Sequence, residues 1–177
     1  SDMANPLHGE FLAAAEDVLR TEGYLLVVAS THWRLDQEMA LLSSFRSGRV
    51  DGLIIAQSDE TNPELTKAII SSELPVVLHD REALEFCDAV VADHRAGAYY
   101  VARHLIELGH QRIAVLTPPP TIRPGRMRMA GYRRALEESG ISFDAALVRQ
   151  LAASSQLSFS EVKSLLALKE PPTAIIS

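Results

Sequence analysis

The chain of 177 residues has little of several features that would assign a protein to a class at once. It contains one cysteine, Cys87, so it can form no internal disulfide and has no Cys-x-x-Cys motif. No apolar run approaches the roughly 20 residues that a membrane-spanning helix needs. No charged-then-apolar signal segment opens the sequence either. These absences exclude a disulfide scaffold and give no reason to expect a membrane protein.

Common signatures of enzymes are also missing. The sequence contains no Gly-x-Gly-x-x-Gly, no P-loop and no Gly-x-Ser-x-Gly motif. Its six histidines include no His-x-x-x-His pair, and there is no second cysteine to complete a zinc site. We therefore expect a protein that is not an enzyme and that uses no cofactor and no metal.

Positive charge is scarce as well. Lys and Arg total 17 against 23 Asp and Glu, which gives a formal net charge of −6. A chain this acidic is poorly suited to binding a phosphate backbone, because such binding requires basic groups that release counterions. If the protein binds DNA, the DNA-binding element must lie outside this sequence.

The most informative stretch that is present runs from Asp93 to Leu116. Between Ala98 and Leu108, apolar residues recur at three- and four-residue spacing, which predicts an amphipathic helix. Gly109 follows, where a left-handed residue commonly ends a helix. Ile113–Leu116 is an apolar run typical of a strand buried on both faces. The stretch therefore predicts half of a parallel β-α-β unit.

Strand and helix alternate in this way about six times along the chain. Further helices are expected at Phe11–Arg20, Gln37–Ser47, Asn62–Ser72, Arg126–Ser139 and Ser158–Lys169, and strands at Tyr24–Ala29, Leu53–Ala56, Pro75–Leu78, Ala89–Ala92, Leu147–Leu151 and Thr173–Ile176. Right-handed crossovers then place helices on both faces of parallel sheets, so the fold class is α/β.

Several segments, taken together and in order, resemble one known family. They are ANPLHGEF at Ala4–Phe11, RVDGLIIA at Arg49–Ala56, PVVLHDR at Pro75–Arg81, HLIELGHQRIAVL at His104–Leu116 and RMAGYRRAL at Arg128–Leu136. This set is similar to the effector-binding domain of the lac repressor (LacI/GalR) family of bacterial transcription regulators. The resemblance covers nearly the whole chain.

The resemblance implies a periplasmic-binding-protein-like fold of type I, with two Rossmann-like lobes and a ligand cleft between them. By this analogy residues 1–109 form the N-terminal lobe and residues 110–177 part of the C-terminal lobe. The first residues look like the exit of a strand, and the last expected strand lacks the elements that close the second lobe in this family. We therefore expect the protein to continue beyond both ends of the sequence.

The resemblance also implies a function. The chain would be the ligand-sensing domain of a cytoplasmic homodimer that binds operator DNA through an N-terminal helix-turn-helix not present here. The effector would be a small polar molecule such as a sugar or a nucleobase-like compound. A periplasmic sugar-binding protein of a transport system is the alternative, and an enzyme built on the same scaffold is a more distant one, since a fold alone does not fix function.

Candidate ligand-binding residues follow from the fold, because ligands of open α/β sheets bind outside the carboxyl ends of the strands. The residues expected at these ends are Leu7, His8, Gln57, Ser58, Asp93 and Arg128. The neighbouring segment His79–Arg81, together with His94 and the Pro118–Pro120 loop, lies at the same edge. Such a mixture of charge, amide, hydroxyl and imidazole suits a small polar ligand.

Individual roles come partly from the family. Arg128 matches the family arginine that holds the effector, although an exposed arginine in a salt bridge is the simpler interpretation. His8 stands where relatives often have an aromatic residue that covers the ligand. Asp93 either contacts the ligand or caps the following helix, and His94 replaces the family's usual asparagine. The proline-rich loop is either a cleft loop or a linker.

Overall fold

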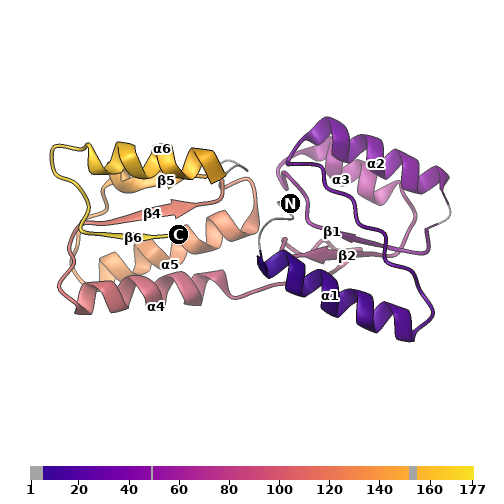
Figure 1. Cartoon of the computed structure of the whole chain (residues 1–177), viewed down its shortest axis with the longest axis horizontal. Helices are drawn as coiled ribbons and strands as arrows, with labels where there is room; N and C mark the ends of the chain where they lie inside the picture. The colour runs from indigo at the N-terminus through magenta and orange to yellow at the C-terminus, as the bar shows by residue number, and fades with distance from the viewer. Residues whose placement is uncertain (1–5, 49, 152–154) are drawn as a thin grey trace.

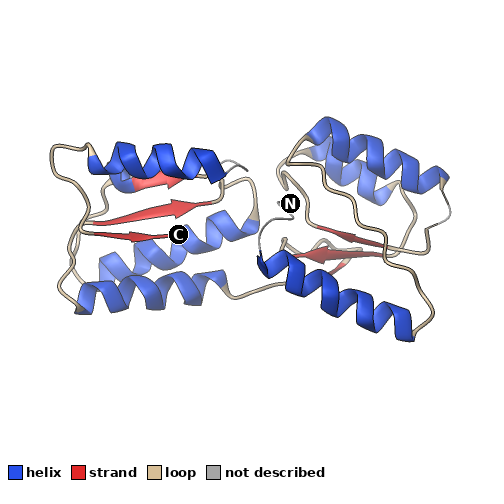
Figure 2. Cartoon of the chain, in the orientation of Figure 1, coloured by secondary structure: helices blue, strands red, loops and turns tan. Residues whose placement is uncertain are grey.

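The chain forms two α/β lobes joined end to end (Figure 1). A computed structural model describes residues 6–48, 50–151 and 155–177. Each lobe has a three-stranded parallel sheet, with the strand orders β1-β2-β3 and β5-β4-β6. Figure 2 shows helices on both faces of each sheet. The α/β class with two parallel-sheet lobes, predicted from the alternating pattern and the resemblance, is confirmed.

The first lobe places its sheet between α1 on one face and α2 and α3 on the other (Figure 1). Its elements are α1 (Pro6–Thr21), α2 (Leu35–Ser47), β1 (Leu53–Ile55), α3 (Pro63–Ile70), β2 (Val76–His79) and β3 (Asp88–Val90). The core between the sheet and α2 and α3 contains Leu42, Leu65, Ile69, Val76 and Leu78. Asn62 starts α3, because its side-chain oxygen accepts hydrogen bonds from the first free backbone N–H groups of the helix.

The second lobe is built around one fully buried strand. Its elements are α4 (His94–Glu107), β4 (Ile113–Thr117), α5 (Arg123–Glu138), the 3-10 helix Ala145–Leu147, β5 (Val148–Gln150), α6 (Ser155–Leu166) and β6 (Ala174–Ile176). Every residue of β4 is buried. Ile113 and Val115 face α4 and α5, whereas Ala114 and Leu116 pack with the core beside α6. The apolar run in the sequence thus becomes the central strand between two cores.

Helices α4 and α5 pack closely because the contact contains a glycine. A Cβ atom at Gly131 would lie 2.1 Å from the backbone oxygen of Arg95 and 2.9 Å from the backbone nitrogen of Tyr99. The next residue, Tyr132, is buried and donates its hydroxyl hydrogen to the Ile113 carbonyl oxygen at 2.7 Å. Burial raises the pKa of Tyr132 to about 12. Gly131 and Tyr132 therefore join α4, α5 and β4 into one packed unit.

The packing of α4 indicates that this helix belongs with the second sheet rather than with the first. We expected this helix in the N-terminal lobe, with the boundary at Gly109. Instead α4 packs against α5, and its Ala102 lies in the core formed with β4. Gly109 does end the helix in a left-handed conformation, with φ of 93°. We propose the boundary in the short crossover before α4, because the helix shares its buried surface with the second sheet.

The segment Tyr24–Ala29, expected as a strand, forms none. It follows α1 without regular secondary structure, and its Leu25 is 87% and its Val27 is 65% exposed. A strand requires a hydrogen-bonded neighbour, and in the described ranges β1 pairs only with β2. The apolar β-branched composition favours a strand, but it carries no information about the partner. No helix in the described ranges is long and apolar enough to cross a membrane.

Candidate ligand site at the lobe junction

The crossover from β3 to α4 is held by Asp80, which directly follows β2. Asp80 adopts a left-handed backbone conformation with φ of 54°, which is unusual for a residue other than glycine. Its backbone N–H donates to the Val90 carbonyl oxygen at 2.7 Å. Its carboxylate accepts from the backbone N–H of Ala92 at 3.4 Å. Asp80 therefore fixes the segment that connects the lobes with both its backbone and its side chain.

The same carboxylate binds His94, the first residue of α4. His94 Nε2 lies 2.7 Å and 2.9 Å from the two carboxylate oxygens of Asp80. On the other side of the ring, Arg128 Nε lies 3.5 Å from His94 Nδ1. Asp80 comes from the first lobe, whereas His94 and Arg128 come from helices of the second. The three side chains thus form a chain of contacts across the junction.

The ionisation of Asp80 matches this geometry. Burial by itself acts to raise the pKa of the Asp80 carboxyl, but hydrogen bonds from His94 and the Ala92 N–H, together with nearby positive charge, outweigh it, and the pKa lies below its ordinary value. Asp80 is therefore an anion at neutral pH. Because its folded-state pKa is lowered, the stability that it contributes is present above the ordinary carboxyl pKa and is lost as the pH falls through the lowered value.

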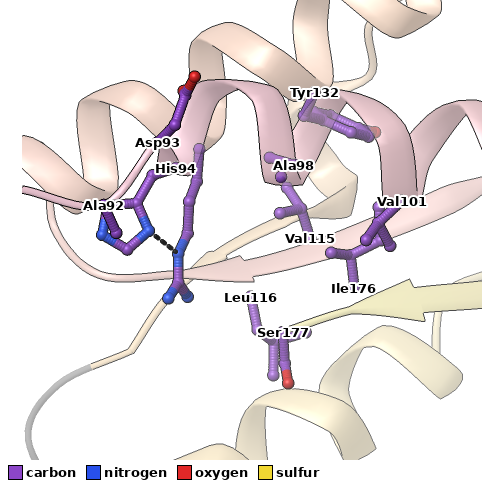
Figure 3. A pocket seen from close by; sticks show the side chains of 12 residues that line it. Ala92, Asp93, His94, Ala98, Val101, Val115, Leu116, Tyr132, Ile176 and Ser177 are labelled. Atoms are coloured by element: carbon purple, nitrogen blue, oxygen red, sulfur yellow. Dashed lines mark hydrogen bonds between the residues drawn. The ribbon is translucent and has the colours of Figure 1, made fainter. Parts of the chain in front are cut away.

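Arg128 and His94 line a pocket in the second lobe. Figure 3 shows the His94 ring at one end of this pocket, and Arg128 contacts that ring. The other lining side chains are mainly apolar and include Ala98, Val101, Val115, Tyr132 and Ile176. In Figure 3 the carboxylate of Asp93 points away from the His94 ring. Within the described ranges, no carboxylate forms an ion pair with Arg128. The pocket therefore combines an apolar wall with a guanidinium group that is open to a ligand acceptor.

Ion pairs connect the lobes beside this pocket. Arg126 Nη1 lies 3.0 Å from Glu60 Oε2, and Arg126 Nη2 lies 3.4 Å from Glu82 Oε2. Arg123 lies 3.8 Å from the same Glu82 oxygen. The Glu60 backbone N–H also donates to the Thr121 carbonyl oxygen at 2.9 Å. Because Thr121 belongs to the proline-rich loop, that loop faces the first lobe, as a cleft loop would.

The predicted site residues are only partly brought together. Asp93 and Arg128 line the pocket, but Gln57 and Ser58 are not among its lining residues. The Gln57 carbonyl oxygen accepts from Arg81 Nε at 2.6 Å, and the Ser58 N–H donates to Glu38 at 3.1 Å. Asp93 caps α4 by accepting from the Ala96 N–H at 2.9 Å. The capping role considered for Asp93 is therefore confirmed, whereas ligand contacts of all four residues stay predictions.

The start of α1 contributes an aromatic group near the end of β2. Phe11 stacks on His79 with ring centroids 3.9 Å apart, and His8 meets the His79 ring edge to face at 6.2 Å. Burial lowers the pKa of His79, which favours its neutral form. His8 is not a lining residue of the pocket at Arg128. The side chain of Leu7 lies outside the part of the chain that the structure describes.

Sequence reasoning missed the acidic residues of the junction. Glu60 and Glu82 lie outside the helices and strands expected from the sequence, and nothing in their local sequence indicates that they bind arginines of α5. Glu38 is 6% exposed although it lies within an amphipathic helix. Arg81, expected only as part of the strand-end segment, is also buried, and burial lowers its pKa despite the opposing charges of Glu60, Asp80 and Glu38. All of these contacts join residues that are distant in the sequence.

Comparison with known proteins identifies the family. Residues 2–177 match the family model described as periplasmic binding proteins and sugar binding domain of LacI family. The chain belongs to this family. It is 30% identical over 180 residues to the transcriptional regulator DegA of Bacillus subtilis, which covers 99% of the chain and 53% of DegA. It is 30% identical over 168 residues to the repressor PurR of Escherichia fergusonii, covering 94% of the chain and 49% of PurR.

Solved structures of LacI-family regulators have the same fold. The Cra regulator of Pseudomonas putida in complex with fructose 1-phosphate has a TM-score of 0.78 and 25% identity, over 98% of this chain and 64% of that one. The CelR–cellobiose complex also has a TM-score of 0.78 and 25% identity, over 92% of this chain and 50% of that one. This LacI-family chain spans about half the length of the curated regulators that it matches.

Proposed function

We propose that this domain is the effector sensor of a LacI-type transcriptional regulator. A small polar effector, such as a sugar or a nucleobase-like compound, binds at the lobe junction and changes the affinity of the whole protein for operator DNA. The DNA is bound by an N-terminal helix-turn-helix outside this chain, in a cytoplasmic homodimer. The curated relatives are transcriptional regulators, which are not enzymes, and this favours sensing over catalysis.

The observation that carries the proposal is Arg128 at the charged end of the pocket. Its guanidinium carries five N–H donors in a planar fork, and only one of them has a partner in the described part of the chain, at His94. The apolar side of the pocket, where Ala98, Val101 and Ile176 are at least partly exposed, suits a sugar or base ring. Of the predicted site residues, Asp93 lines the same pocket. We retain His8, Gln57, Ser58 and Leu7 as candidates that contact the effector only in a more closed arrangement of the lobes.

The lobe junction supplies a physical route from effector to DNA. A ligand changes an equilibrium only if it binds the two states with different affinities. Asp80 of the first lobe binds His94, and His94 contacts Arg128, so a ligand at Arg128 would bind with different affinities to different arrangements of the lobes. A typical allosteric coupling of about 1–3 kcal/mol corresponds to a change of about 5- to 150-fold in operator affinity.

The experiment is a fluorescence titration of the full-length protein with the DNA upstream of its own gene. The operator should have two-fold symmetry, because a homodimer presents two equivalent DNA-binding heads. Fructose 1-phosphate, cellobiose, other sugars and nucleobases are added in turn. At least one should shift operator affinity, and operator must shift the affinity for that compound by the same factor. The 177-residue chain alone should bind no DNA at physiological salt, since its net charge is −6.

The alternative, a periplasmic sugar-binding protein, makes a different prediction. Its full-length form would begin with a cleaved export signal and would bind no DNA with any compound. Sequencing the N-terminus of the mature protein from cells separates the two proposals directly. A mature chain that starts after a secretory signal would refute the regulator.

A further inference from the structure

The two ring nitrogens of His94 have different partners, and these partners indicate which nitrogen carries the proton in the neutral ring. A guanidinium group has donors only, so Arg128 Nε must donate and His94 Nδ1 must accept. The proton of the neutral ring then lies on Nε2, which donates to Asp80 at 2.7 Å. The His94 side chain is 14% exposed and that of Asp80 is 23% exposed, so water competes little for these contacts.

From this arrangement we propose that Asp80 and His94 are a positioning pair. The pair holds the Arg128 guanidinium at the pocket and connects it to the crossover between the lobes. This inference rests on the proposed function for the role of Arg128, but its geometry concerns residues of this chain alone. Neither Asp80 nor His94 needs to touch the effector. They act through Arg128 on one side and through the crossover backbone on the other.

The left-handed backbone conformation of Asp80 explains why this pair is bound to the crossover between the lobes. A left-handed backbone conformation costs an aspartate free energy, and it persists only when contacts with its surroundings stabilise it. Here the surroundings are Val90, Ala92 and His94, which all bind Asp80 and which all lie in or beside the crossover. The conformation of Asp80 therefore aims its carboxylate at the crossover and at the first residue of α4.

The crossover is held from the second lobe as well. Arg123, at the start of α5, donates from Nη1 to the Ala92 carbonyl oxygen at 2.9 Å. Ala92 is thus bound by Asp80 of the first lobe through its N–H and by Arg123 of the second through its carbonyl. A movement of α5 that displaces Arg128 must also change the contacts of Arg123, because both residues are on the same helix. Effector binding at Arg128 therefore reaches the crossover along two parallel routes.

Two charged side chains, Asp80 and Arg128, contact the His94 ring directly. Arg81 and Arg123 bind the backbone carbonyls of Asp80 and Ala92, and the neighbouring Asp93 caps the helix with its carboxylate turned away from the ring. Protonation of the ring would remove the acceptor for Arg128 and place a second cation beside it, while it would strengthen the bond to Asp80. The contact with Arg128 is therefore expected only with the neutral ring.

Two substitutions of His94 test its contact with Asp80 and its contact with Arg128 separately. In His94→Gln the side-chain amide nitrogen occupies roughly the place of Nε2 and keeps a donor for Asp80, but nothing replaces Nδ1. In His94→Asn the amide oxygen stands near the place of Nδ1 and keeps an acceptor for Arg128, but nothing reaches Asp80. His104→Gln, in an exposed position near the other end of α4, is the matched control.

The measurement is NMR of the full-length protein without any ligand, with nitrogen-15 in the histidine rings and arginine side chains. His94→Asn and Arg128→Lys assign the two signals. In the wild type, His94 should carry its proton on Nε2, and the Arg128 Nε–H signal should be separate from those of exposed arginines. The Arg128 signal should persist in His94→Asn and in His104→Gln, and it should merge with those of the exposed arginines in His94→Gln.

Two results would overturn the proposal. One is a proton on Nδ1 of wild-type His94, and the other is an Arg128 signal unchanged by His94→Gln. Asp80→Asn tests the link to the crossover, since asparagine tolerates the left-handed backbone while removing the charge. It should relax the proton preference of His94 and shift the Ala92 amide signal, and an unshifted Ala92 signal would refute that link. These outcomes need no effector, so a failure to find any binding compound would count against the proposed function and not against this inference.

Discussion

The close approach of α4 and α5 predicts a large effect of one methyl group. In Gly131→Ala the new Cβ would meet the Arg95 oxygen at 2.1 Å, although real Cβ atoms stay beyond 3.0 Å. The atoms that it meets are backbone, so no side chain can turn away and the helices must separate by about 1 Å. Such overpacking costs up to roughly 3 kcal/mol, and the better helix propensity of alanine offsets about 1 kcal/mol of it.

We therefore expect Gly131→Ala to lower the free energy of unfolding by about 2 kcal/mol. At about 2–4 °C for each kcal/mol, the midpoint of thermal unfolding should fall by about 4–8 °C. Gly97→Ala is the matched control, because Gly97 is also helical and its added Cβ would meet nothing within 4 Å. It should raise stability by about 0.5–1 kcal/mol. Urea unfolding followed by circular dichroism measures both, and a Gly131→Ala variant as stable as the wild type would refute the packing argument.

Three further outcomes are expected. Tyr132→Phe should lower the free energy of unfolding, measured with urea, by about 1–2 kcal/mol. In the wild type the stability that Tyr132 contributes is fully present below its unfolded pKa of 10 and is lost as the pH rises towards its folded pKa of about 12. The variant should lack this loss of stability at alkaline pH. Arg126→Met should destabilise by about 1–3 kcal/mol by leaving the largely buried Glu60 without its cation. Arg134→Met breaks an exposed pair and should have a much smaller effect. Arg128→Ala should weaken effector binding about 10- to 150-fold in calorimetric titration, and unchanged affinity would remove Arg128 from the site.

The elements that the sequence predicted well are those whose signal is local. The apolar spacing of Ala98–Leu108 and the buried run Ile113–Leu116 identified a helix and a central strand within a few residues. Gly109 ended the helix as expected. The segment Tyr24–Ala29 failed because a strand depends on a neighbour, which no local pattern specifies. The sequence also could not assign α4 to a lobe, since the amphipathic stripe of the helix does not say which sheet will cover it.

In the candidate site, too, the residues marked by local sequence could be predicted and the long-range contacts could not. Strand ends mark an edge of a sheet, so Asp93 and Arg128 could be placed at one pocket from sequence and family resemblance together. Gln57 and Ser58 also follow a strand, but Arg81 and Glu38 bind them from 24 and 20 residues away. The pairing of Asp80 with His94 depends on a left-handed backbone that the residue type permits without requiring. Such contacts follow from the folded arrangement of the two lobes rather than from spacing along the chain.

The burial of β4 has a consequence for the order in which the second lobe comes apart. Its five residues are each at most 3% exposed, and it pairs with β5 on one side and β6 on the other. Amide hydrogens in such a strand exchange with deuterium only when the surrounding structure opens as a whole, whereas edge strands and helix ends open locally. The slowest-exchanging amides of this lobe should therefore lie in β4, and their exchange free energy should equal that of global unfolding.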